Sequence, residues 1–407
     1  MKSISVKNFL NLSLNQTVNI LVAIIITPVL FTKLGDDQYG LVSLSFSIIM
    51  IISIIISYGY NLNGPKKIAL LNTIEEKKEL INEIITLRLI IVLIMTLLIY
   101  FLITFSNFFI GYEKILLFSI ILLYSEALHP IFYLQGENNL SILTYTNLIS
   151  KLIYVVLIIF FINEPNDSFK VNLFLGGVFS IVYLIFWLII FLKNNIFFTW
   201  SSCDRIVFRV KENFEFLFSS IAGHVSIHGG IIILSNFIDN LELGKFALAQ
   251  RIAMLLRMIP VFITQAVLQN ATLINENRKS YLNEYLNKIY FKGLLFTFFI
   301  GIIVTLTSKW IIILLSKEEI TYSQEILSLL SFIPFLSMLN FKNIIKILVN
   351  EKKKILYKAT WITVVFMIIF STIMSYYFGG KGLATALLCS ELISYFIHTF
   401  LLNYFDE

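Results

Sequence analysis

The chain has 407 residues, of which 58% are hydrophobic and only 14% are charged, and its formal net charge is +6. A soluble domain carries about 25% charged residues, so this composition excludes an ordinary soluble protein. Apolar stretches of about 20 residues recur along the whole sequence, and each is long enough for a spanning helix. Because these stretches are too long for the tilted strands of a membrane barrel, we predict an all-α polytopic membrane protein.

The predicted elements are about twelve transmembrane helices in two pseudo-symmetric six-helix lobes. In chain order they cover residues 9–33, 41–63, 82–105, 113–134, 141–162, 171–192, 213–237, 245–267, 287–315, 323–349, 356–378 and 383–403. A polar and basic segment lies between the sixth and seventh helices. It divides the chain into an N-terminal lobe (1–195), an amphipathic connector on the cytoplasmic side (196–212) and a C-terminal lobe (213–407).

The lysines and arginines are unevenly divided between the two sides of these helices. If the N-terminus is cytoplasmic, 19 of them lie on the inner side and 7 on the outer side. Because the inner loops of membrane proteins carry the excess of positive charge, we predict that both termini are cytoplasmic. The net positive charge is therefore a topology signal, and no nucleic-acid partner is expected.

Charged side chains inside the predicted spans indicate a function. An arginine at the centre of a spanning helix costs about 2.5–3.5 kcal/mol on insertion scales, so it normally faces water or a partner. We predict that an anion is bound by the four basic residues inside apolar stretches, namely Arg257, Arg251, Lys151 and Arg88. The alternatives are structural ion pairs, such as Glu126 with Lys151, and a snorkelling side chain at Arg88.

Polar residues recur at helical spacing along several spans, so that they share one face of a helix. Lipid-facing residues would not be polar in rows, so these faces are expected to meet other helices or water. We predict a polar cavity lining formed by Asn11, Asn15, Asn19, Ser43, Asn61, Asn147, Tyr154, His224, His228 and Gln250. Hydrogen bonds across packed helices are the alternative, above all for the serines.

The acidic residues in spans are candidates for ion coupling, and we assign that role to Glu126 and Glu391. His224 and His228 have the i, i+4 spacing of a metal pair, but the sequence offers no third ligand and lacks the HExxH pattern. We therefore predict no metal site, and no cofactor.

Three segments of the first third resemble the polysaccharide (O-antigen) flippases of the Wzx type, in the multidrug/oligosaccharidyl-lipid/polysaccharide exporter superfamily. They are LFTKLGDDQYGLVSLSFSI, SYGYNLNGPKKIAL and PIFYLQGENNL. The resembling positions are Pro28, Leu34-Gly35, Tyr39-Gly40, Tyr58 to Leu62 and Gln135-Gly136. In the second half LGKFALAQRI is similar to the family's pattern, whereas VLQNATL lacks the proline expected there.

The resemblance implies a transporter and not an enzyme. Such proteins flip an undecaprenyl-pyrophosphate-linked oligosaccharide, an O-antigen or capsule repeat unit, across the bacterial inner (plasma) membrane by alternating access. The implied partners are this lipid-linked oligosaccharide and the membrane, with a polysaccharide polymerase and a chain-length regulator as further candidates. A cation-coupled multidrug exporter of the same superfamily is the alternative function, and an integral-membrane polysaccharide polymerase is a more distant one.

Overall fold

The computed structural model describes residues 2–106, 108–193, 198–277 and 279–406. Every regular element in these ranges is helical. The α-helices are α1 (Lys2–Ser57), α2 (Tyr60–Leu70), α3 (Ile74–Phe105), α4 (Glu113–Ser119), α5 (Ile121–Leu128), α6 (Ile131–Gly136), α7 (Leu140–Phe161), α8 (Ser168–Lys193), α9 (Cys203–Leu234), α10 (Asn240–Asn277), α11 (Lys279–Ser316), α12 (Thr321–Leu330), α13 (Ile333–Leu339), α14 (Phe341–Val349) and α15 (Lys353–Asp406). A short 3₁₀ helix, η1 (Pro165–Asp167), precedes α8.

The lengths and hydropathy of these helices confirm the predicted polytopic all-α class. Within the described ranges nine helical stretches are long and apolar enough to span a membrane, and a bent pair within α9 can be counted as a tenth. Two of the nine, Thr17–Leu70 and Lys354–Tyr404, have 54 and 51 residues. A single span needs about 20 residues, so each of these two stretches is long enough for two spans, in agreement with the predicted pattern.

Single glycines produce the sharp turns inside the two longest stretches. Gly35 has φ 76° within α1, and Gly379 has φ 55° within α15. A residue with a Cβ atom is strained in this left-handed region, and glycine is not. The chain can therefore leave one span and enter the next within a few residues, without a long loop.

Two predicted spans are each divided into three short helices. The span over 113–134 contains α4, α5 and α6, and the span over 323–349 contains α12, α13 and α14. In the first of these spans Pro130 interrupts the helix, and the preceding His129 takes the extended conformation with ψ 116°. A proline lacks the amide hydrogen and disfavours a helical residue before it, so the interruption is local and specific.

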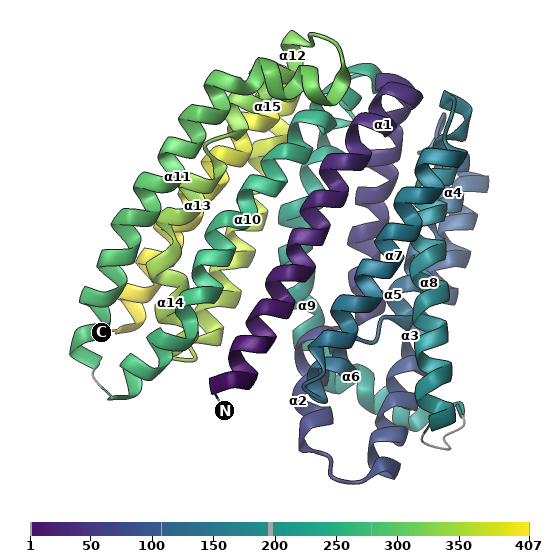
Figure 1. The fold of residues 1–407 in the computed structure, drawn as a ribbon, viewed down its shortest axis with the longest axis vertical. Helices are drawn as coiled ribbons and strands as arrows, with labels where there is room; N and C mark the ends of the chain where they lie inside the picture. The colour runs from purple at the N-terminus through teal and green to yellow at the C-terminus, as the bar shows by residue number, and fades with distance from the viewer. Residues whose placement is uncertain (1, 107, 194–197, 278, 407) are drawn as a thin grey trace. The chain divides into compact units, whose positions relative to one another are not determined.

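The chain folds into two compact units, Met1–His228 and Gly229–Glu407, called unit 1 and unit 2 below. Figure 1 shows their helices. In unit 1, α1 packs on α5 and α7, α5 packs on α8, and α2 packs on α6. In unit 2, α10 packs on α11 and α12, and α15 packs on α12, α13 and α14. The unit boundary falls inside α9, and the lobe limits inferred from the sequence stay a prediction.

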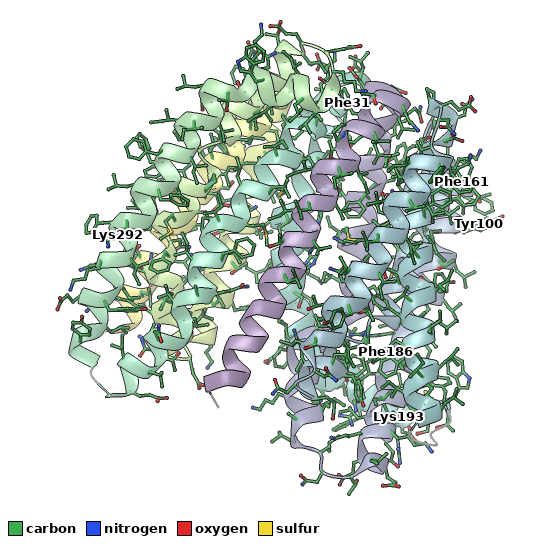
Figure 2. All side chains as sticks on the ribbon, in the orientation of Figure 1. Phe31, Tyr100, Phe161, Phe186, Lys193 and Lys292 are labelled. Atoms are coloured by element: carbon green, nitrogen blue, oxygen red, sulfur yellow. The ribbon has the colours of Figure 1, made fainter. Side chains whose placement is uncertain are left out.

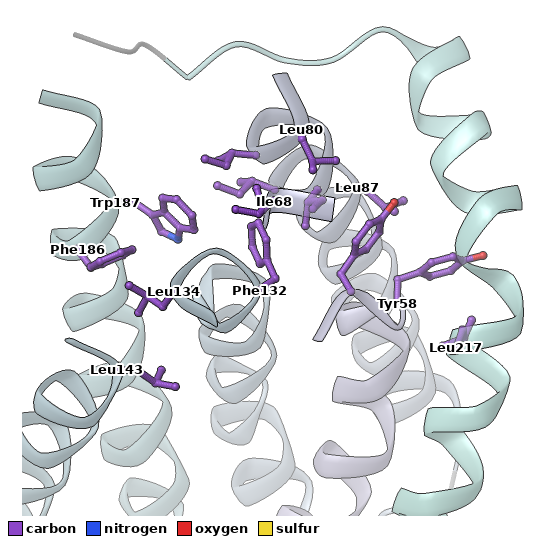
Figure 3. Close-up of a cluster of buried hydrophobic side chains, with 14 of the residues drawn as sticks. Tyr58, Ile68, Leu80, Leu87, Phe132, Leu134, Leu143, Phe186, Trp187 and Leu217 are labelled. Carbon is purple, nitrogen blue, oxygen red and sulfur yellow. The ribbon is translucent and has the colours of Figure 1, made fainter. Parts of the chain in front are cut away.

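Apolar side chains occupy both the interior and the flanks of the helices. Tyr100 and Phe161 are more than half exposed at the flank of unit 1 (Figure 2), as a lipid-facing surface requires. A large buried cluster of unit 1 joins α2 and α6 to α3, α8 and α9 (Figure 3). Its members include Ile68, Phe132 and Trp187, which are 0–3% exposed.

Candidate functional site

Arg257 forms an ion pair within unit 2. Its Nη2 atom lies 2.5 Å from Oε1 of Glu391, which is carried by the second half of α15. The two side chains are 29% and 14% exposed, so the pair is partly shielded. The other guanidinium donors of Arg257 make no hydrogen bond to any residue that the structure describes. The arginine is therefore compensated by one carboxylate and keeps donors for a further acceptor.

Arg251 precedes Arg257 on α10 and is placed differently. It is exposed, and it forms no hydrogen bond or ion pair with the described residues. Six residues on an α-helix separate two side chains by about 120° around the axis, so the two arginines do not share a face. Gln250, predicted to line a cavity, is only 8% exposed.

Lys151, Asn19 and Asn147 come together in unit 1 as a polar cluster between α1 and α7. The Lys151 ammonium donates a hydrogen bond to Oδ1 of Asn19, and Asn147 Nδ2 donates to the same oxygen over 3.1 Å. Asn147 and Lys151 are one turn apart, and Tyr154, which is 6% exposed, lies a further turn along α7. The helical rows of the sequence predict all four residues, and the structure joins Lys151 and Asn147 to Asn19.

Arg88, Asn61 and Glu126 form a second polar group in unit 1. Arg88 Nη2 donates to Asn61 Oδ1 over 2.9 Å, and Asn61 Nδ2 donates to Glu126 Oε1 over 2.9 Å. Glu126 is thus bound by Asn61 rather than by Lys151. Arg88 is 0% exposed, so it neither snorkels nor has a surface in this structure from which to meet a phosphate.

The remaining predicted lining residues are dispersed. His224 Nδ1 lies 3.2 Å from the Ser220 carbonyl oxygen of its own helix. The rings of His224 and His228 are 6.3 Å apart, and His228 also packs edge-on against Phe46. Among the described residues no group of three His, Cys, Asp or Glu side chains could hold a metal ion. Ser43 is half-buried on α1, and the side chains of Asn11 and Asn15 lie outside the described part of the chain.

An ion-pair cluster in unit 1 was missed by the sequence reasoning. Glu83, whose side chain is 7% exposed, accepts from Arg209 over 2.6 Å and lies 3.4 Å from Arg205. Arg209 also pairs with Glu212, which in turn contacts Lys67. The cluster ties the first turns of α9 to α2 and α3. The spacing of Arg205 and Arg209, four residues apart and followed by an acidic residue, was the available signal.

The chain is similar to known proteins over most of its length. The family described as polysaccharide biosynthesis protein matches residues 5–269. Two curated relatives carry the provisional name of O-antigen transporter. The relative from Shigella dysenteriae is 24% identical over 402 residues, which are 95% of this chain and 97% of the relative. The relative from Escherichia coli (strain K12) is 23% identical over 266 residues, which are 64% and 63% of the two chains.

Solved structures share the fold. The lipid II flippase MurJ, in an inward closed conformation, has a TM-score of 0.75 at 17% identity, over 96% of this chain and 87% of MurJ. An inward-facing multidrug resistance transporter of the MATE family, in the MOP superfamily, has a TM-score of 0.71 at 14% identity. That match covers 97% of this chain and 96% of the transporter.

Proposed function

The chain belongs to the polysaccharide biosynthesis protein family, and from this premise we propose that it flips a lipid-linked oligosaccharide across a bacterial inner membrane. The observation that carries the proposal is the match to an O-antigen transporter over 95% of this chain. The fold shared with a lipid II flippase supports the same class of cargo. We further propose that the chain is a transporter without catalytic activity, with both termini in the cytoplasm.

The cationic side chains are proposed to recognise the pyrophosphate. A guanidinium can bind two phosphate oxygens with parallel hydrogen bonds, whereas an ammonium acts as a point charge. Arg251 has unused donors, and Arg257 has donors beyond the one that contacts Glu391. Lys151 adds a positive charge in unit 1, beside amides suited to sugar hydroxyls. Arg88 is left out of this set because its guanidinium is enclosed by protein.

The membrane potential can supply the driving force. Moving one charge across 100 mV is worth about 2.3 kcal/mol, so two uncompensated negative charges leaving a negative interior gain about twice that. Glu126 and Glu391 are the proposed sites for a coupling cation that resets the empty carrier. Alternating access through rocking of two repeats is the general scheme for such folds. A polysaccharide polymerase and a chain-length regulator are the proposed partners downstream.

Deletion of the gene separates the proposed function from the alternatives. We expect loss of surface polysaccharide and accumulation of the lipid-linked repeat unit in the inner leaflet, with unchanged resistance to cationic dyes. Dye sensitivity with intact polysaccharide would favour the multidrug exporter. Normal amounts of single repeat units on the surface without polymer would favour the polymerase.

Point variants then test the cation assignment. Arg257→Gln and Lys151→Gln should each abolish export in complemented cells while the protein still inserts, and Arg257→Lys should restore part of it. The control is Lys288→Gln, because Lys288 is 64% exposed and, within the described part of the chain, pairs only with the exposed Glu284 one turn away. Full export by Arg257→Gln would remove that residue from the substrate site.

A further inference from the structure

Two helix breaks lie close together in unit 1. The first separates α1 from α2, where Tyr58 and Gly59 both have positive φ values of 48° and 70°. The second separates α5 from α6 at His129 and Pro130. Each break leaves backbone carbonyl oxygens without the helical amide that would normally reach them, and inside a membrane protein such groups need another donor.

Arg88, on the neighbouring α3, supplies donors to both breaks. Its Nη1 atom donates to the His129 carbonyl oxygen over 3.0 Å. Its Nη2 atom donates to the Asn61 side chain over 2.9 Å and reaches the Ser57 carbonyl oxygen, the last of α1, at 3.5 Å. The guanidinium carbon also lies 5.1 Å from the centre of the Phe132 ring on α6. One fully buried side chain therefore contacts both sides of both breaks.

The two short helices beyond the breaks pack closely against each other. A Cβ atom at Gly64 of α2 would lie 2.7 Å from the Phe132 Cβ atom, closer than real Cβ atoms approach. A Cβ atom at Gly136 of α6 would lie 2.9 Å from the Pro65 carbonyl oxygen. Glycine at both positions lets α2 and α6 approach at backbone distance, and the buried apolar cluster of Figure 3 encloses the pair.

The Arg88 guanidinium is linked to the Glu126 carboxylate through the Asn61 side-chain amide. Asn61 accepts from Arg88 and donates to Glu126, so its side chain is oriented by both. Arg88 has no direct contact with an acidic side chain among its hydrogen bonds, and its Nε atom has no acceptor in the described structure. A buried arginine held mainly by carbonyl and amide oxygens is costly, which argues for a role beyond simple packing.

We propose that Arg88 is a positioning residue at a double hinge. The pair formed by α2 and α6 turns as one body about the two breaks, and Arg88, through Asn61, holds its resting position. Since Asn61 also binds Glu126, a cation taken up at Glu126 would weaken the orientation of Asn61 and release the pair. This inference rests on the proposed alternating-access function. The pair of α2 and α6 then acts as a gate at the end of unit 1 where these two helices lie.

Hydrogen–deuterium exchange of the purified full-length protein in lipid nanodiscs, without substrate, tests the hinge. In Arg88→Lys we expect amides of 60–70 and 131–136 to exchange about tenfold faster, by the same factor in both segments, because one opening event exposes both. A factor of ten corresponds to about 1.4 kcal/mol, the range of one or two hydrogen bonds to a charged group. Amides of α8 should keep their rates.

Two further variants keep the test decisive. Asn61→Leu keeps a side chain of similar size, removes both polar contacts and should give the same paired pattern if Arg88→Lys does not fold. Arg205→Lys is the control, because Arg205 is 53% exposed and, among the described residues, its side chain bonds only to Glu79 and Glu83. Faster exchange throughout unit 1, or in only one of the two segments, would overturn the hinge.

Measurement of transport alongside exchange separates the two proposals. Loss of export with unchanged exchange in Arg88→Lys would overturn the hinge and return Arg88 to the candidate phosphate ligands. Suppose that exchange rises equally in both segments of Arg88→Lys, but that deletion of the gene leaves surface polysaccharide intact. This result would support the hinge and reject the proposed function.

Discussion

The ion pair between Arg257 and Glu391 allows a substrate role to be separated from a structural one. The relevant perturbation is a double-mutant cycle of Arg257→Gln, Glu391→Gln and the two together. Glutamine keeps most of the side-chain volume in each case, so the cycle removes charge while changing the packing little. The contact to be removed is a single 2.5 Å approach between Nη2 and Oε1.

The expected magnitude follows from the burial of the two side chains. Breaking a buried ion pair by removing one partner costs about 3–5 kcal/mol, whereas an exposed pair is worth about 0.2–1 kcal/mol. Arg257 and Glu391 are 29% and 14% exposed, which places them between these limits. We expect each single variant to lose about 2 kcal/mol of unfolding free energy, with a coupling energy of about 1–2 kcal/mol between them.

Two assays on the wild type, the two single variants and the double variant distinguish a substrate role of Arg257 from a structural one. Unfolding in mixed SDS micelles measures the coupling energy, and complementation of a deletion strain measures export of surface polysaccharide. If Arg257 binds substrate, the double variant regains much of the stability but none of the export. The control pair is Lys288→Gln with Glu284→Gln, whose side chains are 64% and 58% exposed, and its coupling energy should stay below about 0.5 kcal/mol.

A double variant that recovers both stability and export would refute the substrate role of Arg257 and the coupling role of Glu391, because the two side chains would then only have neutralised each other. A coupling energy near zero would refute the ion pair itself. Recovery of stability alone is the result that our proposal requires.

Three other expectations concern separate regions. Lys151→Gln should abolish export and reduce the unfolding free energy by about 1–2 kcal/mol, measured in the same two assays, since it loses the charged hydrogen bond to Asn19. Gly136→Val should destabilise unit 1 by more than about 2 kcal/mol through overpacking, whereas Gly177→Val, where a Cβ atom meets nothing within 4 Å, should be nearly neutral in SDS unfolding. Glu83→Gln should release Arg209 from α3 and speed tryptic cleavage after Arg205 and Arg209 at the start of α9; unchanged cleavage would mean that the cluster does not hold the start of α9.

The positions that carry the family resemblance can now be interpreted physically. Gly35 provides the positive φ at the first turn between spans, and Gly59 has φ 70°. A Cβ atom at Gly59 would also lie 2.8 Å from the Phe216 backbone of α9. Gly136 lies where α6 meets α2. These motif residues therefore determine how the chain bends and packs, and the candidate cations lie elsewhere.

The sequence by itself determined the membrane class, the number of spans and their approximate limits. The reason is that a backbone in lipid must bond to itself, so each crossing needs a long apolar helix that hydropathy reveals directly. Helical periodicity also identified which residues share a face, and so found Asn19, Asn147 and Lys151 as members of polar rows.

Only the tertiary structure decided which faces meet. A row of polar residues indicates that this face of a helix contacts another helix or water. Which helix it contacts depends on how helices distant in sequence pack. For this reason the sequence could not pair Arg257 with Glu391, Glu126 with Asn61, or Arg88 with two helix breaks on other segments. Each pairing joins residues between 27 and 134 positions apart, and it exists because burial makes an unpartnered charge too costly to leave alone.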